Sequence, residues 1–107
     1  MTSGNNKKTG ADIDRIIHEP TRYKIMALLY VIEKADFLFL QNQLELTPGN
    51  LSSHLTKLEK VSFVKVDKHF EGKIPRTMLS LTRKGREEFA KYRETMMQML
   101  GKLPEIE

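Results

Sequence analysis

Residues 47–89 read TPGNLSSHLTKLEKVSFVKVDKHFEGKIPRTMLSLTRKGREEF, and two different hydrophobic periods follow each other within them. At the start, Thr47 is a good N-cap, and Pro48 suits the first helical position, where its missing N–H costs nothing. Apolar residues then recur at i, i+4 and i+7, as Leu51, Leu55 and Leu58. This spacing predicts a helix over residues 47–60 that packs on one leucine face only.

The second part of this stretch has a period of two, which is typical of strands. Apolar residues alternate with polar ones over 63–67 and again over 77–81, and a loop containing Gly72 lies between the two runs. The sequence therefore predicts a β-hairpin whose outer part spans residues 70–76.

The rest of the chain is mostly helical in pattern. Apolar spacing and N-cap residues predict four further helices. The first runs from near Asp12 to Glu19, where Pro20 breaks it, and the second begins at Pro20. The other two cover residues 38–45 and 83–103, and a short extended link lies at 35–37. The order is helix, helix, short strand, helix, helix, strand, strand, helix. This is a mainly α fold (α+β) with a small β-hairpin. Residues 1–10 are small and polar, which predicts a disordered tail before one domain over residues 11–103.

The charge of the chain is unevenly distributed. Over 107 residues, 18 Lys and Arg against 14 Asp and Glu give a net charge of +4. Residues 57–86 hold nine basic and three acidic side chains, a net +6, which leaves −2 for the remainder. A localised basic segment is typical of proteins that bind a polyanion such as nucleic acid, and the alternative is a solvated lysine-rich surface.

Several classes of protein are disfavoured by what the sequence lacks. It has no cysteine, which excludes disulfides, thiolate zinc sites and thiol catalysis. The three histidines, His18, His54 and His69, lie in different predicted elements without metal-ligand spacing, and there is no phosphate-binding glycine loop. We therefore expect no enzyme, no metal and no cofactor. No apolar run has the length of a membrane span or of a signal peptide, which predicts a cytoplasmic protein without a membrane partner.

The helices over 38–45 and 47–60, joined by a tight turn, have the form of a helix-turn-helix, whose second helix enters the major groove. With the hairpin behind it, the stretch 47–89 resembles the recognition helix, wing and following helix of MarR/ArsR-type winged-helix transcriptional regulators. Residues 16–44, IIHEPTRYKIMALLYVIEKADFLFLQNQL, are similar to the first core helices of the same group. The resemblance covers roughly residues 12–100. It is most specific in Pro20-Thr21-Arg22, in Leu51/His54-Leu55/Leu58, and in Leu81-Thr82 followed by Gly85.

The chain departs from the family pattern at two positions. Leu38 stands where threonine or serine often caps the helix before the recognition helix, and Asp36 offers an alternative cap. Ser62 stands where glycine often closes the recognition helix. Neither position lies on the predicted DNA face.

The recognition helix has a second face that suits a groove, because at about 100° per residue its polar residues fall opposite the leucines. Gly49 and Ser53 allow close approach, and Asn50 is the candidate for reading a base. Lys57 and Lys60 suit phosphates. Free backbone N–H groups near Gly49 and Asn50 offer one more phosphate site. The alternative is an ordinary solvated helix face.

Two wing cations and a histidine extend this face. Lys73 and Arg76 can reach flanking phosphates or the minor groove, although Arg76 can instead pair with Glu71. The resemblance places His54 near DNA, and a packed structural role is the alternative. The predicted DNA-binding residues are Thr47, Gly49, Asn50, Ser53, His54, Lys57, Lys60, Lys73 and Arg76.

The last predicted helix carries more apolar surface than a helix beside the wing needs. Its apolar residues follow a short heptad-like spacing, and dimerisation on paired half-sites is how such domains gain enough phosphate contacts. The predicted dimer-interface residues are Ile13, Ile16, Ile17, Phe89, Tyr92, Met96, Met99, Leu100 and Leu103. The alternative is that this helix folds back over its own core.

Together these observations predict a homodimeric, sequence-specific regulator of transcription that binds double-stranded DNA and acts as a repressor by occupying an operator. The alternative is a winged helix used for protein–protein contact within a transcription-related assembly. The resemblance also implies a small-molecule effector of unknown identity, because many MarR-type proteins bind small phenolic or lipophilic effectors between their domains.

Overall fold

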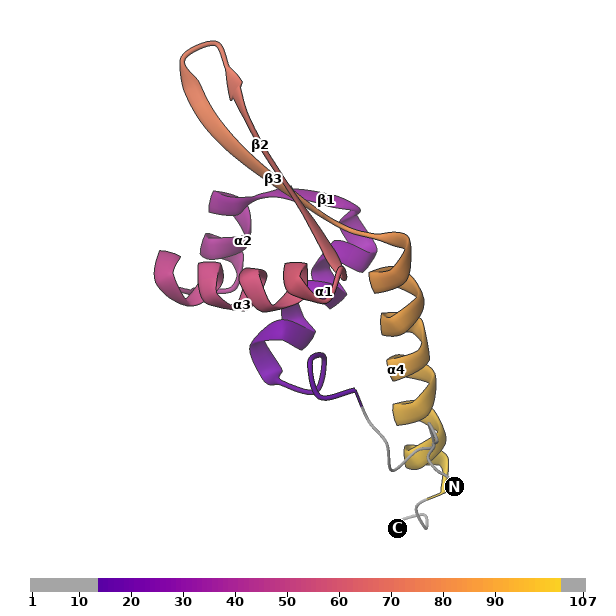
Figure 1. The fold of residues 1–107 in the computed structure, drawn as a ribbon. Helices are drawn as coiled ribbons and strands as arrows, with labels where there is room; N and C mark the ends of the chain where they lie inside the picture. The colour runs from indigo at the N-terminus through magenta and orange to yellow at the C-terminus, as the bar shows by residue number, and fades with distance from the viewer. Residues whose placement is uncertain (1–13, 103–107) are drawn as a thin grey trace.

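The computed structural model describes residues 14–102, which form four helices and one three-stranded antiparallel sheet. In chain order the elements are α1 (Pro20–Ile32), β1 (Lys34–Asp36), α2 (Phe37–Gln43), α3 (Pro48–Lys60), β2 (Val64–Glu71), β3 (Ile74–Leu81) and α4 (Arg83–Gly101). Figure 1 shows the hairpin of β2 and β3 projecting beyond the helices. This architecture confirms the predicted mainly α fold with a small β wing. None of these helices is long and apolar enough to cross a membrane.

The segment before α1 differs from the prediction. Residues 14–19 form a turn, not the last part of a helix. The Asp14 carboxylate accepts hydrogen bonds from the N–H groups of Ile16 (2.8 Å) and Ile17 (3.2 Å), and these bonds close the turn. The proline that begins α1 disfavours a helical residue before it, so the chain enters α1 from extended backbone. Residues 1–13 lie outside the described part of the chain, together with the predicted tail.

The strands are ordered β1-β3-β2 in the sheet. β2 and β3 pair along their full length and form the predicted hairpin. Gly72 is the first of the two loop residues of this hairpin, and its φ is 65°. Glycine adopts this conformation without strain, which allows the tight turn. β1, predicted as a short strand at residues 35–37, pairs with the other edge of β3, with Ala35 opposite Leu79. Its partner strand was not predicted.

The core lies where α1 and α3 meet the base of the sheet. Ile25 and Leu29 of α1 are fully buried there. Leu51, Leu55 and Leu58 of α3 are also buried, which confirms the predicted leucine face. Burying one such side chain contributes about 1.5–3 kcal/mol, so this single face anchors α3 and leaves its opposite face free.

α3 is followed by a strained turn. Ser62 has a φ of 65° in the left-handed region, which costs an L-residue about 1–2 kcal/mol and suits glycine. This is the position at which the resemblance described above implies glycine. The serine therefore adopts a backbone conformation that glycine favours, at a cost in stability.

Replacing Ser62 with glycine is expected to raise the free energy of unfolding by about 1 kcal/mol, because the strain is relieved and the Ser62 carbonyl still accepts from Thr82 Oγ1. Urea denaturation followed by circular dichroism measures the change. Ser53→Gly, the same replacement inside α3, is the matched control and should lower stability by about 0.5 kcal/mol. A Ser62→Gly midpoint at or below that of the unchanged protein would contradict this account.

The first turn of α4 is attached to the backbone that leads into β2. The Thr82 N–H donates to the Phe63 carbonyl (3.0 Å), and Thr82 Oγ1 donates to the Ser62 carbonyl (2.5 Å). The same hydroxyl caps α4 by accepting the Gly85 N–H (2.9 Å). A Cβ at Gly85 would overlap the Phe63 carbonyl oxygen. The Leu81-Thr82 and Gly85 pattern thus reflects close contact between α4 and the sheet.

Candidate nucleic-acid interface

The outer face of α3 is formed by the side chains that point away from the core. Thr47 caps the helix, because its Oγ1 accepts the N–H of Asn50 (3.1 Å). The bond engages the Asn50 N–H, which corrects the expectation that this group is free for a phosphate. The exposed predicted residues on and before α3 are Thr47, Gly49, Asn50, Ser53, Lys57 and Lys60.

Four lysines near this face are available to an anion. Among residues 14–102, no acidic side chain lies within ion-pair distance of Lys57, Lys60, Lys68 or Lys73. Lys57 and Lys60 also lie in the last turn of α3, where the helix dipole favours cations. Part of the basic segment identified in the sequence is therefore present as unpaired charge on α3 and the wing.

His54 lies beside the core and not on the outer face of α3. Its Nδ1 is 3.1 Å from Nη1 of Arg22 and 3.8 Å from Oε1 of Glu19. Arg22 is only 9% exposed, and its Nε donates to the Ile16 carbonyl (2.7 Å). His54 is thus engaged in the packed structural role that was the alternative to DNA contact, and it joins α3 to α1.

Sequence reasoning missed the partners of His54, although the Pro20-Thr21-Arg22 motif was an available signal. Glu19 caps α1 by accepting the N–H of Arg22 (2.8 Å). Burial acts to raise the pKa of Glu19, but the Arg22 N–H bond and the charges of His54 and Arg22 together outweigh it, so this pKa lies below its ordinary value. The cluster connects the turn over residues 14–19 with α1 and α3.

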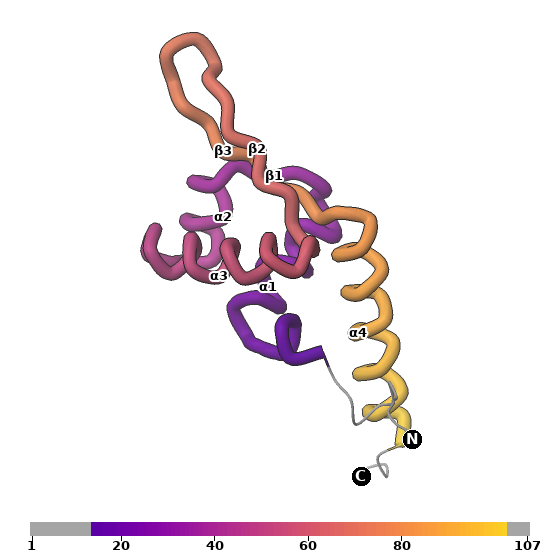
Figure 2. The backbone as a smooth tube through the Cα atoms, viewed as in Figure 1, coloured from indigo at the N-terminus to yellow at the C-terminus, as the bar shows by residue number. Residues whose placement is uncertain are grey.

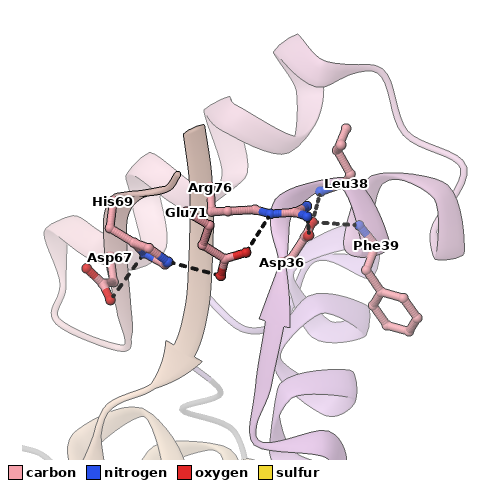
Figure 3. A network of polar contacts seen from close by, with 7 residues as sticks. All are labelled: Asp36, Leu38, Phe39, Asp67, His69, Glu71 and Arg76. Carbon is pink, nitrogen blue, oxygen red and sulfur yellow. Dashed lines mark hydrogen bonds and ion pairs between the residues drawn. The ribbon is translucent and has the colours of Figure 1, made fainter. Parts of the chain in front are cut away.

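Arg76 is held within the protomer (Figure 3). Its Nε donates to Glu71 Oε1 (3.2 Å), and its Nη1 donates to Asp36 Oδ2 (3.3 Å). Asp36 caps α2, because its Oδ1 accepts the N–H groups of Leu38 (2.7 Å) and Phe39 (3.2 Å). The alternative pairing with Glu71 is therefore formed, and the guanidinium that was predicted to contact DNA instead ties the wing to α2.

The predicted dimer residues are divided between the core and the surface. Ile17 and Phe89 are buried in the core of this protomer, which corrects their assignment to a partner interface. The reason is that the first turns of α4 pack back against α1 and the preceding turn. Tyr92 is half-buried, with its hydroxyl 2.8 Å from His18 Nδ1 and its ring against Tyr23.

Further along, α1 and α4 form an open apolar groove of about 880 Å³. In Figure 2 the C-terminal half of α4 extends away from α2 and α3. Ile16 and Met96 are half-buried, whereas Met97, Met99 and Leu100 are exposed. Ile13 and Leu103, which were also predicted for the interface, lie outside the described residues.

This architecture defines a winged helix-turn-helix domain. Helices α2 and α3 form the helix-turn-helix within a body completed by α1, the hairpin of β2 and β3 is the wing, and α4 is the outer helix. Residues 21–100 match the family model described as Winged helix DNA-binding domain. The chain belongs to this family, which consists of DNA-binding transcriptional regulators and is not enzymatic. This confirms the resemblance found in the sequence.

Known relatives agree with this assignment. An uncharacterised protein of Methanocaldococcus jannaschii is 40% identical over 86 residues, which are 79% of this chain and 92% of that protein. A transcriptional regulator homologue from Pyrococcus horikoshii OT3 is 35% identical, with a TM-score of 0.79 over 82% of this chain and 87% of that chain. NadR, solved in complex with 4-hydroxyphenylacetate, is 26% identical, with a TM-score of 0.67 over 80% of this chain and 63% of that chain. The solved neighbours are transcriptional regulators of the MarR family.

Proposed function

We propose that this DNA-binding regulator is a homodimeric, sequence-specific repressor that places α3 in the major groove of double-stranded DNA. The observation that carries the proposal is the exposed polar face of α3 opposite its buried leucines. The major groove is about 12 Å wide and admits one helix. Gly49 and Ser53 add little bulk to this face, so the helix can approach closely, and the Asn50 amide can pair with an adenine edge.

Phosphate contacts complete the proposed interface. Lys57 and Lys60 lie on the outer face of α3, and Lys73 lies at the exposed loop of the wing. Their ammonium groups are unpaired within residues 14–102, so binding a phosphate does not require breaking an ion pair. Occupation of an operator by this surface would exclude the transcription machinery.

The proposed dimer forms through the groove between α1 and α4. A second copy is the expected occupant because Met97 and Leu100 leave apolar surface exposed there. This surface belongs to elements other than α3 and the wing, so dimerisation and DNA binding do not compete. Two subunits would present their α3 helices to half-sites about one helical turn apart. NadR was solved in complex with 4-hydroxyphenylacetate. The tyrosines that line the groove would suit a similar aromatic effector, enclosed between the groove and the second copy.

Lys57→Ala combined with Lys60→Ala is expected to weaken duplex binding at least tenfold near 100 mM salt. Each lost phosphate contact should also reduce the slope of log affinity against log salt by about 0.9. Fluorescence anisotropy measures both quantities, with duplexes enriched from a random-sequence pool as the probe.

Lys91→Ala combined with Lys102→Ala is the matched control, because it removes the same charge from the α4 side. The control should keep the affinity and the slope nearly unchanged. Equal salt slopes for the two double variants would overturn the assignment of the α3 face. Failure of the unchanged protein to bind any duplex at about 50 mM salt would instead favour the protein-contact alternative.

A further inference from the structure

The outer end of the wing carries exposed apolar side chains, and nothing within residues 14–102 covers them. Phe70 is 71% exposed and Ile74 is 56% exposed, although both lie in paired strands. Phe70 pairs across the hairpin with Pro75, which is also exposed, so these two apolar residues share one face. Ile74 pairs with Glu71 and lies on the other face. Side chains of this size are costly to leave in water, which makes the wing end a candidate contact surface.

The face of the wing that carries Phe70 is the one turned toward α3. Alternation along β2 places Phe70 on the same face as Lys68 and Val66. Val66 and Lys68 line a hollow of about 590 Å³ together with Ser52 and Thr56 of α3. Phe70 therefore continues outward from α3, toward the path that a duplex lying on α3 would take.

The opposite face of the wing is engaged in internal contacts. His69 lies 3.8 Å from Asp67 and 3.4 Å from Glu71, and Arg76 pairs with Glu71 and with Asp36 (Figure 3). The arginine that could have entered a minor groove is thus retained in this network. Near the wing end, Lys68 and Lys73 have no acidic partner among residues 14–102.

We propose that the wing contacts the minor groove through an apolar wedge, with Phe70 inserted at a base step and the exposed Pro75 opposite it against the adjoining sugars, while Lys68 and Lys73 hold the flanking phosphates. In this arrangement Arg76 is a positioning residue that fixes the wing on α2. Apolar wedges partly unstack the step they enter and bend the duplex by about 20–90°. Pyrimidine–purine steps are the easiest to unstack, so we expect Phe70 to prefer a flexible step such as TA. The inference rests on the proposed DNA-binding function and specifies how the wing takes part.

Phe70→Ala tests the wedge without touching a phosphate contact. We expect about a tenfold loss of affinity for the selected duplex, because alanine removes the aromatic ring that stacks on the bases. The salt slope should stay that of the unchanged protein, and the change in energy transfer between dyes at the two duplex ends should become smaller as the bend relaxes. Phe39→Ala, which removes an exposed phenylalanine from α2, is the matched control and should alter none of these quantities.

Phe70→Trp supplies a second readout, because the chain contains no tryptophan. Its emission should be quenched on addition of the duplex, whereas Phe39→Trp should keep its emission. The wedge would be overturned if the Phe70→Trp emission were not quenched by the duplex and Phe70→Ala bound the duplex with full affinity. The proposed role of α3 would then stay intact. That result would favour a protein partner for the wing end. If the unchanged protein did not bind the duplex at all, the proposed function as a whole would be overturned instead.

Discussion

Gly85→Ala is expected to lower the free energy of unfolding by about 3 kcal/mol or more. The new methyl group would overlap the Phe63 carbonyl oxygen and would come within 2.8 and 2.9 Å of the carbonyl carbon and Cα of the same residue. All of these are backbone atoms, which cannot swing aside as the end of a flexible side chain can. Forcing extra volume into such a contact typically costs about 1–3 kcal/mol, and more when the backbone must shift.

The shift would also break the attachment of α4. Relief of the overlap requires the helix to move away from the Phe63 carbonyl, which accepts the Thr82 N–H at 3.0 Å. Phe89, buried one turn further along α4, would move with it. We therefore expect loss of the α1–α4 groove together with loss of stability.

Urea denaturation measures the effect, and Gly49→Ala is the matched control. Gly49 also lies in the first turn of a helix, but a Cβ there would meet nothing within 4 Å. Alanine at this position should leave stability unchanged or raise it by up to about 1 kcal/mol, because alanine is the better helix former. Equal urea midpoints for the two variants would show that α4 does not depend on the close contact at Gly85.

The parts of the fold that depend on short-range sequence were predictable. Thr47 caps α3 as predicted, and Thr82 caps α4 in the same way, because an N-cap bond joins residues only three positions apart. The leucine face of α3 and the hairpin were equally predictable, since a helix and a strand impose different periods on their buried residues. The sequence also located Asp36 as the cap of α2.

The parts that depend on which surface covers a residue could not be predicted in the same way. The spacing of Phe89 along α4 indicated that it would be covered, but the same spacing arises whether the cover is α1 or a second copy. Ile17 was assigned to a partner for the same reason, and it is buried in the core of its own protomer.

Contacts between charged residues far apart in the sequence also could not be predicted from the hydrophobic periodicity. Arg76 and Asp36 are 40 positions apart and meet only because β1 adds to β3. β1 has three residues, too few to show a strand period in the sequence. A basic residue in a wing was therefore assigned to DNA, although the sheet places a carboxylate beside it.

Arg22→Met is expected to lower the free energy of unfolding by about 2–3 kcal/mol at neutral pH. Methionine fills the space of the apolar part of the side chain, so the loss comes from the hydrogen bonds to the Ile16 carbonyl (2.7 Å) and to His54 Nδ1 (3.1 Å). Partners left without a bond in a largely buried position account for this magnitude. Lys24→Met, an exposed change on the same helix, should shift stability by no more than about 0.5 kcal/mol.

The effect of Arg22→Met should also depend on pH through Glu19. The folded state lowers the pKa of Glu19 from its ordinary 4.5, so the stability linked to this carboxylate is present above that value and is lost as the pH falls through the lowered pKa. The variant lacks the Arg22 charge that helps to lower this pKa. The difference in unfolding free energy between the unchanged protein and Arg22→Met should therefore narrow between about pH 7 and about pH 3.5 in urea titrations. A difference of the same size at both pH values would show that Arg22 acts through its two hydrogen bonds alone, without electrostatic support from Glu19.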